Sequence, residues 1–245
     1  MSPGARQLLR PAWLLSHLLV IGLVVVAANL GFWQLDRLDA RRAYNAVVAA
    51  RADEPVVTLA TALGVLEGGG MPEDLRHTRV AVSGTWVDGA QVYLANRSMD
   101  GVPGVHVISL LRIDGLVPGV VVDRGFVHRG LFLEGDSASW APATADVELS
   151  GSLDVPRTGE RGSGAEVDRI DLVALSERWG TSLAPMWIRA SGDGTSGIPV
   201  AAPVVDLGAG SHLSYAVQWF VFTLIGLGGY PLVLFRLARR DPALA

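Results

Sequence analysis

Two long apolar runs, one near each end of the chain, constrain this sequence more than any other feature. The first, Trp13–Trp33, contains His17 as its single ionisable residue, and the second, Tyr215–Phe235, carries no charge. An α-helix rises 1.5 Å per residue, so about 20 residues are enough to cross the ~30 Å hydrocarbon core of a bilayer. The sequence therefore predicts two transmembrane helices, over residues 13–33 and 213–235.

A cleaved signal peptide is the alternative interpretation of the first run. Arg6 and Arg10 would form its basic region, and Ala27–Ala28 would offer the small residues of a cleavage site. However, the apolar stretch is longer than that of an ordinary signal peptide and ends in the bulky Gly31–Trp33. We therefore expect the helix to be retained, and a mature protein whose mass begins near Asn29 would contradict this expectation.

The distribution of charge favours one orientation in the membrane. The expected tails, residues 1–12 and 236–245, hold five of the 20 basic residues, whereas almost all of the 24 acidic residues lie between the helices. Basic residues in short loops stay in the cytoplasm, and long domains cross the membrane largely regardless of charge. We therefore expect both tails in the cytoplasm and residues 34–212 on the extracytoplasmic side of the plasma membrane.

The residues between the two helices read as an α+β domain with a β-rich, mostly antiparallel sheet and a few helices. Helical character continues over Gln34–Arg51, which has no glycine or proline. Asp88–Gly89 separates two alternating segments, Arg79–Val87 and Gln91–Asn96, and predicts a hairpin. The other expected elements are short helices near Pro72–Arg76 and over Asp168–Trp179, and strands over Val105–Ile113, Val117–Val127, Val147–Val155 and Pro185–Ala190.

Several classes of function are disfavoured by the residues that the chain lacks. It has no cysteine, which excludes disulfides, thiolate nucleophiles and thiolate metal sites. No two of its five histidines are spaced two or four residues apart, and it contains neither a phosphate-binding loop nor a Gly-x-Ser-x-Gly motif. A net-acidic domain is a poor partner for nucleic acid. We therefore expect a protein that is not an enzyme and does not bind nucleic acid.

One histidine lies in a more suggestive position, at the start of the second apolar run. On a helix, His212, Tyr215, Trp219 and Phe222 share one face, since each residue advances by about 100°. A neutral imidazole beside aromatic rings suits the iron of a flat apolar macrocycle. An interfacial histidine within an ordinary aromatic belt explains the same pattern. Both interpretations stay open from the residues alone.

A polar residue in the first apolar run predicts where the two helices pair. Gly22, Asn29 and Trp33 share one face of that helix. An amide inside the bilayer faces protein more readily than lipid, and glycine allows helices to approach closely. We therefore expect this face to contact the second helix.

Four blocks of residues follow one another in a recognisable order. They are Leu30–Leu35 with Arg37; Gly84–Trp86, Arg97 and Gly101–Val107; Val122–Val127; and His212–Phe220. Together they resemble the surfeit locus protein 1 family, membrane factors that assist assembly of haem-copper cytochrome c oxidase. The chain departs from the family pattern at Ser109–Leu110, where Thr-Pro is usual, and at Asp123 and Phe126, where Asn and Trp are usual.

The resemblance implies a non-enzymatic role in delivering haem a to the catalytic subunit of the oxidase, subunit I, or inserting it there. Oxidase subunits, other assembly proteins and membrane lipid are the implied partners. The histidine that opens the second span is the proposed haem ligand of the family, and it corresponds to His212, with Tyr215 and Trp219 beside the ring.

Four further residues match the family blocks without a role that their chemistry alone assigns. Trp33, Gln34 and Arg37 follow the first span. Arg124 would either pair with a haem propionate, which suits a guanidinium group, or hold the domain together.

Two other classes of function remain as alternatives. One is a membrane-anchored extracytoplasmic binding or sensor module that works through a partner protein. The other is an enzyme anchored at both ends, which a closed pocket with paired acids would support.

Overall fold

The structure is a computed structural model, and it divides the chain into two units that are described separately below. The first unit comprises residues 1–47 and 207–245, and the second comprises residues 48–206. The residues whose structure is described are 8, 10–113, 115–116, 118–135, 137–141, 146–159, 164–191, 197–201 and 207–239.

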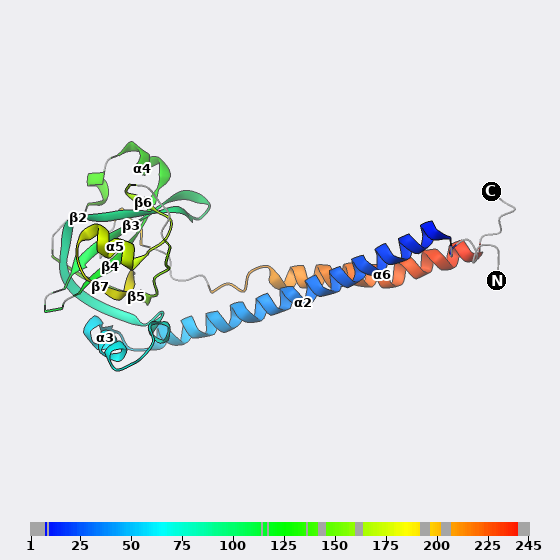
Figure 1. The fold of residues 1–245 in the computed structure, drawn as a ribbon, viewed down its shortest axis with the longest axis horizontal. Helices are drawn as coiled ribbons and strands as arrows, with labels where there is room; N and C mark the ends of the chain where they lie inside the picture. Colours follow the sequence, from blue (N-terminus) through cyan, green and yellow to red (C-terminus); the bar gives the residue numbers. More distant parts are fainter. Residues whose placement is uncertain are drawn as a thin grey trace. The chain divides into compact units, whose positions relative to one another are not determined.

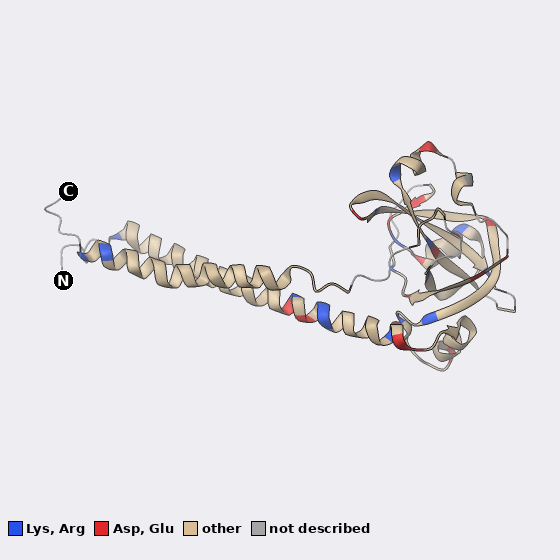
Figure 2. Cartoon of the chain, turned by 180° about the vertical axis from the view of Figure 1, so that it is seen from behind, with Lys and Arg blue, Asp and Glu red and all other residues tan. Residues whose placement is uncertain are grey.

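Two long helices dominate the first unit. Helix α2 extends from Pro11 to Asp53 and helix α6 from His212 to Arg239 (Figure 1). Both are long and apolar enough to cross a membrane. Figure 2 shows that the middle of α6 and the apolar half of α2 carry no charged residue. The two predicted helices are therefore confirmed as helices, and their insertion in a bilayer stays a prediction.

Helix α2 extends beyond its apolar run. This extension was predicted, because the sequence has no glycine or proline over Gln34–Arg51. It continues without interruption to Asp53. The chain then reaches Pro55, and a proline disfavours helical geometry in the residue before it. The helical continuation predicted over Gln34–Arg51 is thus confirmed.

Helices α2 and α6 pack together through glycines. A Cβ atom added at Gly31 would lie 2.7 Å from Cε1 of Phe220, and one added at Gly226 would lie 2.5 Å from Cγ2 of Val24. The rings of Phe32 and Phe220 meet edge to face, with centroids 5.2 Å apart. A larger side chain at either glycine would have to displace Phe220 or Val24, so both glycines favour close packing of the two helices.

The predicted pairing face of α2 is wrong. Asn29 is exposed, Trp33 is 47% exposed, and nothing from another element lies within 4 Å of a Cβ added at Gly22. The amide of Asn29 instead donates a 2.8 Å hydrogen bond to the carbonyl of Val25 in its own helix. Because the backbone satisfies this donor, the amide does not need the second helix, and the fit of small residues decides the contact face.

A ring of five strands forms the second unit. Each strand pairs with the next in the order β2, β3, β4, β7 and β5, and β5 pairs with β2 again to close the ring. Two-residue strands β1 and β6 add parallel pairings to β2, and β4–β7 is parallel too, so the sheet is mixed although its longest ladders are antiparallel. The strands are β1 Val57–Thr58, β2 Arg79–Met99, β3 Val102–Arg112, β4 Gly119–His128, β5 Asp146–Asp154, β6 Glu166–Val167 and β7 Leu183–Ala190.

The hairpin predicted at Asp88–Gly89 is wrong, because β2 continues through it. Gly89 has a φ of +71°, and the register with β3 shifts between Trp86 and Gln91, as at a β-bulge. The hairpin forms instead at Asp100–Gly101, whose φ angles of 51° and 80° suit a two-residue turn. An Asp-Gly pair therefore gives either a bulge or a turn, and the longer apolar pattern decides which.

Three apolar clusters stabilise this unit. One combines inward-facing residues of the ring, such as Leu111, Leu153 and Ile188, with α3, which extends from Leu59 to Glu67. The second packs α5, Leu172–Trp179, against the other face of the strands, and the third surrounds Trp140. The remaining short elements are η1 Pro72–Leu75, α4 Arg129–Glu134 and η2 Ser137–Trp140.

Two helices of this unit differ from the sequence prediction. Helix α3 was not predicted, and α5 begins at Leu172 rather than at Asp168 because Asp171 caps it: the carboxylate accepts from the backbone N–H groups of Val173 and Ala174. The short helix predicted near Pro72–Arg76 is confirmed as η1. Val117, the first residue of the strand predicted over Val117–Val127, lies outside the described residues.

Candidate functional site

A hydrogen bond joins two of the predicted site residues across the helix pair. Nδ1 of His212, the first residue of α6, lies 2.9 Å from Oε1 of Gln34 on α2. Both side chains are partly buried. The family blocks that hold these residues are separated by most of the chain, and the pairing of α2 with α6 brings them together.

The segment that leads into α6 is held by two further side chains of α2. Nε of Arg41 donates to the carbonyl of Gly208 at 3.2 Å, and Nδ2 of Asn45 donates to the carbonyl of Leu207. These bonds tether the chain four or five residues before His212. The backbone is therefore held on both sides of His212: by α6, which begins at this residue, and by the tethered segment before it.

An aromatic surface continues from His212 along α6. Tyr215 is 49% exposed, Phe222 is 46% exposed, and Trp219 is partly buried with its ring edge to face against Phe222 at 5.8 Å. Ala216 is 1% exposed and lies on the face toward α2. These three aromatic residues thus follow His212 along α6, and the exposed rings of Tyr215 and Phe222 are accessible to a flat apolar molecule.

Trp33 and Arg37 lie on α2 and contact each other rather than His212. The guanidinium carbon of Arg37 is 5.4 Å from the centre of the Trp33 ring, a cation–π contact on an exposed part of the helix. The structure therefore separates the first family block into Gln34, which faces α6, and Trp33 with Arg37, which do not.

A second polar contact between the helices lies near their other ends and was missed by the sequence reasoning. Nδ1 of His17 is 2.7 Å from the hydroxyl of Tyr230, which also lies 3.0 Å from Oγ of Ser16. Nε2 of His17 is 3.1 Å from the carbonyl of Leu8. Both ring nitrogens have partners, so this histidine acts as a polar link between the helices and is a poor candidate ligand.

Two of the central family blocks meet on the neighbouring strands β3 and β4. Nδ1 of His106 lies 2.8 and 3.0 Å from the two carboxylate oxygens of Asp123, which is 2% exposed and also accepts from the N–H of Gly125. Gly125 has a φ of +129°, and a Cβ there would lie 2.2 Å from the carbonyl of Val200. These contacts stabilise the core of the domain. They also explain why residue 125 is a glycine, since no larger residue fits there without a clash.

Arg124 is buried in the same region, with 2% of its surface exposed. It donates from Nη1 to the carbonyl of Trp140 at 2.9 Å, and its guanidinium carbon lies 5.2 Å from the Trp86 ring. Burial also lowers the pKa of the neighbouring block residue Arg97, whose Nη2 donates to the carbonyl of Asp168. The contacts of both arginines are made within the domain.

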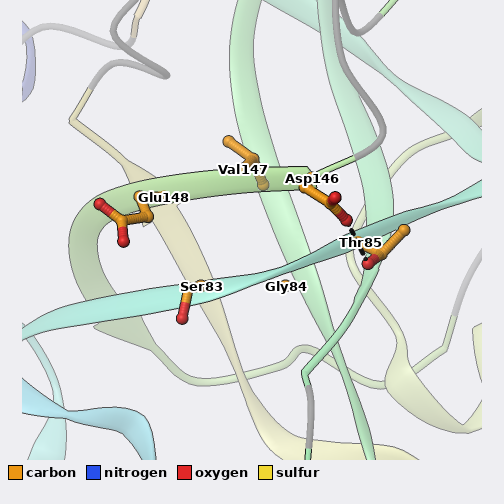
Figure 3. A pocket seen from close by; sticks show the side chains of 6 residues that line it. All are labelled: Ser83, Gly84, Thr85, Asp146, Val147 and Glu148. Carbon is orange, nitrogen blue, oxygen red and sulfur yellow. Dashed lines mark hydrogen bonds between the residues drawn. The ribbon is translucent and has the colours of Figure 1, made fainter.

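One hollow of the domain is lined by polar side chains of β2 and β5. A hollow of about 300 Å³ between β2 and β5 is bordered by Ser83, Thr85, Asp146 and Glu148 (Figure 3). The hydroxyl of Thr85 donates to Asp146, and Glu148 points elsewhere. Among the described residues, no three histidine or carboxylate side chains gather as a metal site would require.

Two comparisons with known proteins agree with the positions of the four blocks. A sequence model of the SURF1 family matches residues 21–224, which span all of the blocks. A SURF1-like protein of Rickettsia felis is 23% identical over 241 residues, covering 92% of this chain and 97% of that relative. The chain therefore belongs to the SURF1 family.

Proposed function

We propose that this protein assists the assembly of haem-copper cytochrome c oxidase by delivering haem a to subunit I or helping to insert it. The SURF1 family is generally linked to oxidase assembly, and membership of it supports this class of function. The observation that carries the proposal to haem is the position of His212, hydrogen-bonded to Gln34 beside the exposed rings of α6.

The side chains around His212 fit a haem group chemically. Nδ1 is engaged by Gln34, so Nε2 is the ring nitrogen left to act as a ligand. Tyr215, Trp219 and Phe222 supply flat apolar surface of the kind on which a macrocycle stacks. When bound, haem would supply the iron atom, and His212 would supply an oriented imidazole as its ligand.

The proposal includes a location in the plasma membrane. Helices α2 and α6 would both span it, with the two tails in the cytoplasm and the β domain on the extracytoplasmic side. His212 would then lie at the outer interface, where polar and aromatic side chains are common. Subunit I, which is also embedded in the membrane, would meet the protein there together with other oxidase or assembly proteins.

A deletion strain tests the class of function. We expect a strain without this gene to lose oxidase activity and the absorbance of haem a in its membranes, and the wild-type gene to restore both. Replacement of His212 by alanine is expected to restore less than the wild type, whereas replacement of the exposed His128 serves as the control. Normal oxidase in the deletion strain, together with capture experiments that recover no oxidase subunit, would overturn the proposal.

A further inference from the structure

We infer that Gln34 is a positioning residue that selects the tautomer of His212 with the proton on Nδ1 and the lone pair on Nε2. This inference rests on the proposed function, in which Nε2 of His212 binds the haem iron. The inference gives a role to Gln34, a residue of the first family block to which its chemistry alone assigned no role.

The argument begins with the atom that Gln34 presents. Its Oε1 lies 2.9 Å from Nδ1 of His212. An amide oxygen has lone pairs and no proton, so it only accepts hydrogen bonds. A bond of this length is satisfied when Nδ1 of the imidazole carries a hydrogen. In a neutral ring the other nitrogen, Nε2, then holds the lone pair that a metal needs.

Metal-binding histidines commonly use this arrangement. The ring nitrogen opposite the metal donates to a carboxylate, a carbonyl or water, which fixes the tautomer and the plane of the ring. Loss of such a partner typically weakens metal binding about 10- to 100-fold. The carbonyl of Gln34 occupies the corresponding place beside His212.

The surrounding packing holds the acceptor and the imidazole in register. Gly31, one helical turn before Gln34, packs against Phe220, and Leu38, one turn after it, is 3% exposed. Arg41 and Asn45 bind the carbonyl groups of the segment that leads into His212. The two helices therefore cannot slide past each other without losing several contacts as well as this hydrogen bond.

A purely mechanical link between the helices makes a different prediction. If Gln34 only clasped the two helices, its amide could turn, and the N–H group would then donate to an unprotonated Nδ1. That orientation would place the proton on Nε2 and block iron binding there. The protonated nitrogen of His212 thus distinguishes positioning from clasping.

The first experiment measures the tautomer without haem. Full-length protein with ¹⁵N-labelled histidine, in lipid nanodiscs at alkaline pH, would be studied by NMR, and the His212 signals would be assigned by their loss in His212→Ala. We expect a proton on Nδ1 in the wild type and in Gln34→Glu, which keeps an acceptor. We expect Gln34→Met to lose this selection, while the matched control Gln218→Met, at an exposed glutamine of α6, keeps it.

The second experiment measures binding of purified haem a and of the same porphyrin without iron. Gln34→Met is expected to weaken haem binding about 10- to 100-fold and to leave the affinity for the iron-free ring unchanged, because only iron ligation depends on the tautomer. Gln34→Glu is expected to retain tight haem binding. Equal losses for both ligands would mean that Gln34 only maintains the helix pair, and would overturn the inference.

The two experiments separate this inference from the proposed function. A wild-type spectrum with the proton on Nε2 overturns the role of Gln34 even if haem binds elsewhere. Unchanged haem binding in His212→Ala removes His212 as the ligand, while the tautomer measurement still reports whether Gln34 selects the protonated nitrogen.

Discussion

His106, which is partly buried, pairs with the buried Asp123 across neighbouring strands β3 and β4, with Nδ1 of the imidazole 2.8 Å from the nearer carboxylate oxygen. The carboxylate is 2% exposed and also accepts from the backbone of Gly125. Both residues belong to family blocks. Their contacts show that these two blocks meet in the core of the domain, where their first role is to maintain it.

Replacing His106 by phenylalanine is expected to lower the free energy of unfolding by about 3 kcal/mol, because it leaves a buried carboxylate without its main partner. Urea denaturation of the full-length protein in nanodiscs, followed by tryptophan fluorescence, measures the loss. The same change in an Asp123→Asn background should cost clearly less, since a neutral amide tolerates burial better. An equal loss of unfolding free energy in the two backgrounds would show that the interaction between His106 and Asp123 does not stabilise the domain.

Replacing Gly125 by alanine is expected to destabilise the domain by about 3 kcal/mol, because backbone strain costs about 1–3 kcal/mol and a steric clash adds to it. Its φ of +129° disfavours any side chain, and the new Cβ would lie 2.2 Å from the carbonyl of Val200. Gly64, in α3, is the matched control, because a Cβ there meets no neighbour within 4 Å. Gly64→Ala should stabilise slightly, by up to about 1 kcal/mol; thermal unfolding of both variants compares them.

Replacing Gly31 by leucine is expected to separate α2 from α6, since the added side chain would occupy the place of the Phe220 ring. The chain has no cysteine, so spin labels on cysteines introduced at the exposed Val25 and Leu224 report the separation of the two helices. We expect a longer distance between the labels for Gly31→Leu and no change for Gly22→Leu, which lies on the open face. Equal distances in the two variants would contradict the observed packing.

The stability of the domain is expected to fall as the pH drops through the range in which His77 titrates. Burial lowers the pKa of this histidine below its ordinary value of 6.5. Just below pH 6.5, the unfolded chain therefore binds more protons than the folded chain. The stability that the neutral His77 contributes above pH 6.5 is lost as the pH falls toward the lower pKa of the folded state. His77 has a φ of +66°, which asparagine tolerates, so His77→Asn is the suitable variant. Urea midpoints at about pH 8 and pH 5 should differ less in His77→Asn than in the wild type; an unchanged difference would assign the effect to other groups.

The long helices and most strands were predictable because their signals are local. An uncharged run of about 20 residues and an alternating apolar pattern each specify one element. The Asp88–Gly89 bulge and the closure of the ring by β2 and β5 depend on which distant strands pair, and no short pattern encodes that choice. Helix α3 was missed although its signals are local: Leu59, Ala62 and Leu63 follow helical spacing, and Thr58 caps the helix.

The candidate site was predictable as a set of residues but not as an arrangement. The resemblance to the family identified His212 and Gln34, and nothing in their spacing showed that they hydrogen-bond. One signal could have suggested it: Gln34 follows the C-terminal end of the first predicted span and His212 precedes the N-terminal end of the second, so antiparallel helices would place them at one depth. The pairing face was misjudged because Asn29 satisfies its amide within its own helix.

The closed ring of strands limits how a partner protein can approach the domain. A sheet with a long free edge can recruit an extended segment of another chain by strand addition. Here β2, β3, β4, β7 and β5 pair with one another around the ring, and the strands added to it, β1 and β6, are only two residues long. In the described part of the domain a partner protein therefore has little backbone to which it can add a strand, and recognition is left to side chains on the outer surface of the ring and to the helices.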